Sequence, residues 1–143
     1  YNPRNKEIKC IVEGKARGNL IGGNLSIICS SLGTENEIDT RNKILFIEEI
    51  GEEPYKVDRM LLQLVQAGKI NECAGIIFGY FSSCEPSNPN QSLTISEVIK
   101  ELIKPCGKPI IAGVACGHSL PSLTLPMGVE VVIDSKNKNI KII

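Results

Sequence analysis

Three apolar runs of strand length constrain the fold of this chain more than any other feature. They are KILFIE around Ile44–Ile47, GIIFGYF over residues 75–81 and PIIAGV over residues 109–114. Runs without polar alternation are typical of strands buried on both faces, as in a parallel sheet. Because segments of helical character separate the runs, the sequence predicts an α/β domain.

Two of the intervening segments carry helix signals. Asn24 is placed to cap a short helix over LSIICSS, and Gly33 stops it. A longer helix follows Pro54 and stops at Gly68. Its apolar residues recur at the three- and four-residue spacing of a helix face that packs on a core, namely Val57, Met60, Leu61, Leu64 and Val65.

The rest of the chain adds a third helix and the outer strands. Thr94 and Glu97 have capping-box spacing, which predicts a helix running to about Ile103. Ile8–Val12 is interpreted as a strand, and the tail, MGVEVVIDSKNKNIKII, as two strands around a Ser-Lys-Asn-Lys turn. No internal repeat or linker is evident, so we expect one compact domain over residues 1–143.

Four glycines lie in the segment EGKARGNLIGGN, between Gly14 and Gly23. Glycines before a helix N-terminus can bring backbone amides to an anion. The Gly-Lys-Ser/Thr element of a phosphate loop is absent, however, and GNLIGGN lacks the dinucleotide-binding spacing. We therefore interpret LIGGN, the end of this segment, as a tight turn that feeds the following helix and that can line a pocket.

The composition argues against two classes of binding partner, nucleic acids and membranes. The 143 residues carry 16 basic and 16 acidic side chains, so no net charge draws the chain to nucleic acid or to an anionic membrane. Aromatic residues make up 4% and Trp is absent, which argues against base-stacking platforms. The apolar runs are too short for a membrane helix, and nothing resembles a signal peptide. Because the chain begins at Tyr1 without an initiator Met, we expect a piece of a longer protein.

The cysteines and the single histidine bear on redox state and metal binding. No two cysteines form a CxxC pair, and several lie in apolar stretches, where free Cys behaves as a small hydrophobe. We expect reduced thiols in a cytoplasmic protein, with neither a metal site nor a cofactor, since one histidine does not complete a zinc ligand set. The six residues are Cys10, Cys29, Cys73, Cys84, Cys106 and Cys116.

His118 and a strand-end carboxylate are the candidate catalytic groups. His118 lies in a Gly-flanked loop just beyond the third apolar run, where α/β proteins place catalytic groups. Glu48 and Glu49 follow Ile47, and a carboxylate at a buried strand end needs a partner. Histidine and carboxylate are two members of a nucleophilic triad, but no GxSxG elbow supplies the third. Because alternate strand residues face opposite sides, only one glutamate can meet His118.

Other interpretations of these residues stay open. His118 could be an ordinary surface histidine, and Cys116, two residues before it, could serve as a thiol nucleophile that would show selective alkylation. The GGN and GH loops could also hold a ligand in a non-catalytic binding module. A pure binding module has no need of a contact between His118 and a strand-end carboxylate, so this contact separates the alternatives.

Several motifs follow one another along the chain. Each is weak evidence alone, but the whole series in its order is highly specific. It comprises GNLIGGNLS and LGT, then ILFIEEIGEEPYKVDRMLLQLVQAG, then GIIFGYF, PIIAGVACGH and LPMG. Running from about Gly14 to Gly128, the series resembles the C-terminal domain of the LD-carboxypeptidase family, which includes the microcin C self-immunity peptidases.

The resemblance implies a swivelling β/β/α-type domain with a mixed sheet, from a serine peptidase with a Ser-Glu-His triad. The family Glu and His match Glu48 and His118, and Glu49 is the second choice for the carboxylate. The resemblance further implies hydrolysis of an L,D peptide bond, typically releasing terminal D-alanine from a murein tetrapeptide in cytoplasmic cell-wall recycling. Self-immunity members instead cleave a peptidyl or aminoacyl nucleotide.

The same resemblance places the nucleophilic Ser in an N-terminal domain that is absent from this chain. We therefore expect the chain to be inactive alone and to partner that domain in its parent protein. We also expect an apolar patch beside His118, drawn from Leu120, Leu123 and Leu125, and association into homodimers.

Overall fold

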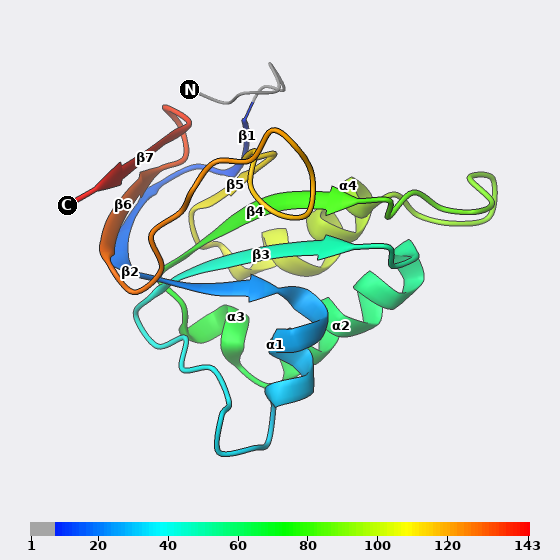
Figure 1. The fold of residues 1–143 in the computed structure, drawn as a ribbon, viewed down its shortest axis with the longest axis horizontal. Coiled ribbons are helices and arrows are strands. Elements are labelled where there is room, and N and C mark those ends of the chain that lie inside the picture. The colour runs from blue at the N-terminus through cyan, green and yellow to red at the C-terminus, as the bar shows by residue number, and fades with distance from the viewer. Residues whose placement is uncertain (1–7) are drawn as a thin grey trace.

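A curled mixed sheet forms the centre of the computed structural model, which describes residues 8–143; the first residues of the predicted domain, 1–7, lie outside it. Within the described part, the sheet has seven strands in the order β1-β5-β4-β3-β2-β6-β7 (Figure 1). The strands are β1 (Lys9–Val12), β2 (Lys15–Asn24), β3 (Ile44–Ile50), β4 (Gly75–Ser82), β5 (Ile110–Ala112), β6 (Glu130–Asp134) and β7 (Asn139–Ile142).

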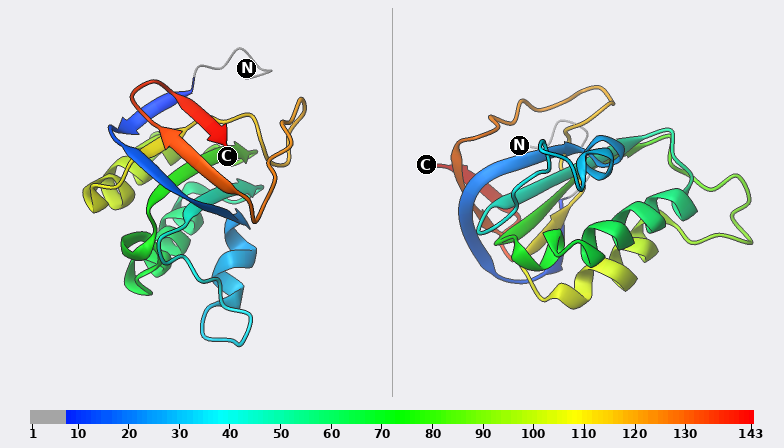
Figure 2. Two further views of the ribbon diagram at one scale, coloured as in Figure 1. Left: turned by 90° about the vertical axis from the view of Figure 1, so that its left-hand side faces the viewer. Right: turned by 90° about the horizontal axis from the view of Figure 1, so that it is seen from below.

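The three apolar runs form β3, β4 and β5, and their predicted burial is confirmed. β2, β3, β4 and β5 run parallel, whereas β1 pairs antiparallel with β5 at one edge, and β6 and β7 continue antiparallel from β2 at the other. The outer strands curl over one face of the sheet (Figure 2). The expected α/β class with a mixed sheet is therefore confirmed.

The helices cover the opposite face of the sheet (Figure 2, right). Asn24 caps the first helix, with its side-chain oxygen accepting a hydrogen bond from the Ile27 amide, and the capping box of Thr94 and Glu97 is present. No helix within residues 8–143 is both long and apolar enough to span a bilayer. The elements are α1 (Leu25–Ser31), α2 (Pro54–Gln66), α3 (Lys69–Glu72), α4 (Ile95–Val98), the π-helical turn η1 (Ile99–Ile103) and the 3₁₀ turn η2 (Lys104–Cys106).

Two of these elements differ from the prediction. The helix capped by Thr94 is α-helical only to Val98, continues as a π turn to Ile103, and extends past the predicted end as a 3₁₀ turn to Cys106. The short helix α3 was not predicted, and it begins directly after Gly68, which has a positive φ of 79°. Gly68 thus ends α2, as expected, but the chain resumes helical geometry one residue later.

The glycine-rich segment is a strand, so its interpretation as a tight turn is wrong. Lys15–Asn24 forms the whole of β2, which pairs with β6 through its first half and with β3 through its second. Its glycines permit close approach of a neighbouring backbone: a Cβ at Gly22 would lie 1.9 Å from the Phe46 carbonyl oxygen, and one at Gly18 would lie 2.5 Å from the Asn42 carbonyl oxygen. Only the end of the segment, at Asn24, leads into a helix.

Two apolar cores lie on opposite sides of the sheet, and alternate residues of β3 enter different ones. Leu45 and Ile47 belong to the core under the helices. Ile44 and Phe46 belong to a second core on the concave side, closed by β6. By the same alternation, Glu48 faces the concave side of the sheet and Glu49 faces the helices.

Candidate active site

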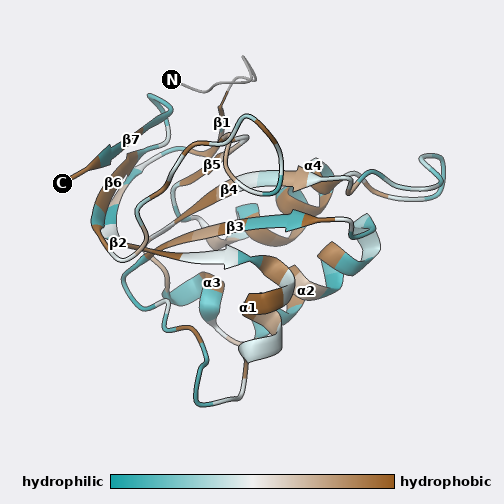
Figure 3. Ribbon diagram, viewed as in Figure 1, coloured by the Kyte–Doolittle hydropathy of each residue, from teal (hydrophilic) through white to brown (hydrophobic). Residues whose placement is uncertain are grey.

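The carboxyl end of β3 places two adjacent glutamates in the interior. Glu48 is 4% exposed and Glu49 is 2% exposed. They form a hydrophilic stretch near the end of an otherwise hydrophobic strand (Figure 3). Since a buried carboxylate is costly unless it is hydrogen-bonded, the partners of these two side chains define what each can do.

Glu48 faces the concave side and contacts His118. Its Oε2 lies 2.8 Å from Nδ1 of the imidazole. The Glu48 side chain is 6% exposed, whereas the His118 side chain is 53% exposed. The hydrogen bond and the charge of Glu48 raise the pKa of His118 above its ordinary value, against a smaller opposing effect of burial. The structure thus contains the carboxylate-imidazole contact expected from the sequence.

Gly117, just before the histidine, lies where the Glu48 carboxylate leaves no space for a side chain. Its φ is 132°, and a Cβ built on it would lie 2.8 Å from Oε2 of Glu48 and 3.3 Å from Cβ of Tyr80. A side chain at this position would compete with the carboxylate for the same space. Gly117 is not among the site residues predicted from the sequence, although a glycine directly before the only histidine in the sequence is a signal for a position where no side chain fits.

Glu49 faces the helices and is engaged in a different network. Its Oε1 accepts hydrogen bonds from Asn24 Nδ2 at 2.7 Å and the Ile50 amide at 2.8 Å. Its Oε2 accepts from the Ser26 amide at 2.8 Å and the Ser26 hydroxyl at 2.5 Å. Burial tends to raise the pKa of Glu49, but the hydrogen bonds, that of the Ser26 hydroxyl foremost, outweigh it and lower the pKa. Glu49 therefore fastens the start of α1 to β3 and faces away from His118.

The thiol of Cys116 lies in an unfavourable setting for a nucleophile. Burial, as the largest cause, raises its pKa above the ordinary value, and the charge of Glu48 acts in the same direction. A raised pKa leaves less thiolate, which is the reactive form. All six cysteines, each within the described residues, are free. Across residues 8–143, no group of three or more His, Cys, Asp or Glu side chains is arranged to hold a metal ion.

The leucines after His118 form less of an apolar patch than predicted. Leu120 is 82% exposed. Leu123 and Leu125, however, are partly buried against the concave core. The expected three-leucine patch is therefore wrong in extent, because the chain after Pro121 folds back on the segment that follows β5, where the Leu123 amide donates to the Ala115 carbonyl at 2.7 Å.

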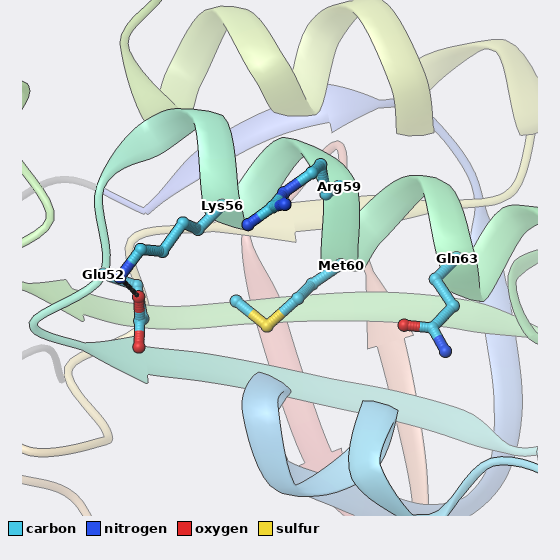
Figure 4. A pocket seen from close by; sticks show the side chains of 5 residues that line it. All are labelled: Glu52, Lys56, Arg59, Met60 and Gln63. Atoms are coloured by element: carbon cyan, nitrogen blue, oxygen red, sulfur yellow. Dashed lines mark ion pairs between the residues drawn. The ribbon is translucent and has the colours of Figure 1, made fainter.

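The surface of the domain carries two hollows. One of about 380 Å³ lies along α2 and is lined by Glu52, Lys56, Arg59, Met60 and Gln63, with Lys56 ion-paired to Glu52 at 2.9 Å (Figure 4). It includes neither Glu48 nor His118. The other, of about 580 Å³, lies between the ends of β4 and β5 and the start of α4, and it reaches the histidine loop at Ser119. The second hollow therefore reaches the residue next to His118, although neither Glu48 nor His118 lines it.

Comparison with known proteins identifies the family of this chain. The family model described as the LD-carboxypeptidase C-terminal domain matches residues 17–133. The chain is 45% identical over 128 residues to the "Probable murein peptide carboxypeptidase" of Bacillus subtilis, covering 90% of this chain and 40% of that protein. It is 34% identical over 134 residues to the Microcin C7 self-immunity protein MccF of Escherichia coli, covering 90% of this chain and 37% of that protein.

Solved structures show the same architecture. A structure of MccF in complex with glutamyl sulfamoyl guanosine has a TM-score of 0.83 and 31% identity, covering 95% of this chain and 40% of that one. The muramoyltetrapeptide carboxypeptidase from Oxalobacter formigenes has a TM-score of 0.81 and 32% identity, covering 91% of this chain and 45% of that one. This chain thus spans about 40% of the length of the curated relatives named above. It belongs to the LD-carboxypeptidase family and corresponds to the C-terminal domain of its members.

Proposed function

We propose that this domain supplies the general base and its orienting carboxylate to a serine carboxypeptidase. His118 is the base and Glu48 is the orienting group. The observation that carries the proposal is the 2.8 Å contact between Glu48 Oε2 and His118 Nδ1. This contact fixes the proton on Nδ1 and leaves Nε2 to accept a proton from a nucleophile. The half-exposed imidazole is accessible to a group brought by another domain.

The nucleophile is a serine of an N-terminal domain in the parent protein. His118 takes the proton of the serine hydroxyl as the oxygen attacks the scissile carbonyl, and it then passes that proton to the departing amine. Water hydrolyses the acyl-enzyme by the same proton transfers. Glu48 stabilises the imidazolium that forms at each stage. No cofactor takes part, and the chain alone does not turn over substrate.

The bond that is cut is an L,D peptide bond at the end of a murein tetrapeptide, and the product released is the terminal D-alanine. The reaction belongs to cell-wall recycling in the cytoplasm. The parent enzyme is a homodimer. The identity of 45% with the Bacillus subtilis relative, against 34% with MccF, supports a murein peptide over a peptidyl nucleotide. The hollow of about 580 Å³ beside Ser119 offers room for the rest of the peptide.

The test compares the 143-residue chain with the full-length protein that carries it, using release of D-alanine from a murein tetrapeptide as the assay. We expect turnover by the full-length protein and loss of turnover by about 10⁴-fold or more in His118→Ala. The chain alone should show none. Turnover by the chain alone that Cys116→Ala abolishes would instead establish the thiol mechanism, and cleavage of only a peptidyl nucleotide would replace the murein substrate.

A further inference from the structure

The loop that carries His118 lies beyond the end of β5, outside the hydrogen-bonding ladder of the sheet. Its imidazole is about half exposed, so packing alone encloses only part of the ring. A base that transfers protons needs its ring held within a fraction of an ångström of the productive position. The groups that hold the loop therefore matter as much as the contact with Glu48.

β4 fastens this loop on both sides of the histidine. Before it, the Tyr80 amide donates to the Cys116 carbonyl at 2.8 Å. After it, the Tyr80 hydroxyl donates to the Pro121 carbonyl at 3.0 Å. Tyr80 is only 7% exposed and lies against Gly117. Its side chain therefore packs on the loop, and its amide and its hydroxyl are hydrogen-bonded to the loop.

A second side chain of β4 makes a third connection. The hydroxyl of Ser82 is hydrogen-bonded to the hydroxyl of Ser119, the residue directly after the histidine. Ser82 and Tyr80 are two positions apart on the same strand, so both face the same side of the sheet. The connections at Cys116, Ser119 and Pro121 thus surround His118 in the sequence.

We propose that Tyr80 and Ser82 are positioning residues, which hold the His118 loop so that the imidazole stays on Glu48. The proposal rests on the proposed function for its catalytic meaning, but the placement of the ring is measurable without any substrate. The Tyr80 hydroxyl bonds to Pro121 and the Ser82 hydroxyl to Ser119, both in the loop that carries the imidazole. Each acts through the backbone or side chain of a loop residue beside it.

The variants that isolate these contacts are Tyr80→Phe and Ser82→Ala, since each removes a single hydroxyl and leaves the packing in place. Tyr55→Phe and Ser30→Ala are the matched controls. Tyr55 is 56% exposed on α2, and the Ser30 hydroxyl bonds only to the Ile27 carbonyl of its own helix in this structure. Ser82→Thr, which keeps a hydroxyl, should restore the properties of the parent.

The first readout is the pKa of His118 in the 143-residue chain, followed by proton NMR. Because this is the only histidine in the sequence, its ring signals need no assignment. We expect the raised pKa to fall toward about 6.5 in Tyr80→Phe and in Ser82→Ala, and to stay unchanged in both controls. Loss of thermal stability with an unchanged His118 pKa would overturn the proposal and leave the hydroxyls a structural role only.

The second readout is D-alanine release by the full-length protein carrying the same substitutions. Each single variant should lower kcat about tenfold with KM unchanged, and the double variant about a hundredfold, because the base is displaced and not removed. Where His118→Ala abolishes turnover, an unchanged kcat in both single variants would also overturn the proposal. If the His118 pKa falls as expected although His118→Ala leaves the full-length activity intact, the positioning stands and the proposed function fails.

Discussion

Two carboxylates that are neighbours in the sequence occupy opposite environments at the end of β3. Glu49 meets the start of α1 and receives hydrogen bonds from Asn24, Ser26 and the Ile50 amide. Glu48 meets His118, whose side chain is half exposed. The first carboxylate is enclosed by fixed neutral donors, whereas the second has a titratable partner at the surface.

The difference separates a structural carboxylate from one suited to chemistry. Fixed donors hold Glu49 ionised and tie two elements together, and none of those donors changes its charge near neutral pH. The partner of Glu48 is an imidazole, which can be neutral or protonated, and Glu48 raises the pKa of that imidazole, so the charge of the partner can change during a reaction. Burial is nearly the same for both glutamates and does not distinguish them.

Neutralising each carboxylate in turn in the full-length protein should separate their roles most strongly. Glu48→Gln should lower kcat by about 10⁴-fold, because the amide no longer imposes the correct imidazole tautomer. Glu49→Gln should lower it far less. D-alanine release, measured on protein whose circular dichroism matches that of the parent, checks both. A larger kinetic loss in Glu49→Gln than in Glu48→Gln would reverse the assignment of the two roles.

Stability should show the opposite order. Glu49→Gln should reduce the free energy of unfolding by about 3 kcal/mol, because an amide nitrogen replaces an oxygen that faces hydrogen-bond donors. Urea unfolding of the 143-residue chain measures this. The exposed Glu35, changed to Gln, is the control and should alter stability by less than about 0.5 kcal/mol. A cost for Glu49→Gln no larger than that of the control would contradict its structural role.

The smallest expected effect is the pH dependence of the Glu48-His118 pair. Because the folded protein raises the pKa of His118, the pair stabilises the fold fully below about pH 6.5, and the contribution is lost as the pH rises through the folded value. The difference in unfolding free energy between the parent and Glu48→Gln should therefore be larger at about pH 5.5 than at about pH 8. A difference that does not change with pH would mean that the pair is not coupled to protonation.

The sequence alone specified much of this arrangement, for physical reasons. Apolar runs identified β3, β4 and β5, because strands buried on both faces need them. Strand alternation required the two glutamates to face opposite sides of the sheet, and the resemblance of the motif series to the family indicated Glu48 as the partner of His118. The segment over β2 was misread because glycines mark both turns and strands with close neighbours, and only the paired strand distinguishes them.

The residues that hold the His118 loop could not be predicted from the sequence, for a different reason. Tyr80 and Ser82 contact residues about forty positions later, at Pro121 and Ser119. Local propensity and periodicity carry no information about which hydroxyl meets which loop. Such contacts follow only from the register of β4 against β5 and from the path of the loop that leaves the sheet.

The glycines of β2 have a consequence beyond close packing. β2 pairs with β3 so that Gly22 lies opposite Phe46 and Asn24 opposite Glu48. A slip of one residue in the pairing of β3 would turn every side chain of the strand to the other face and exchange the two glutamates. The alignment of β2 with β3 therefore selects which of two identical side chains meets the histidine. A change at Gly22, which is not itself a reacting group, would disturb that selection, so the pairing of β2 with β3 helps to decide which glutamate meets the histidine.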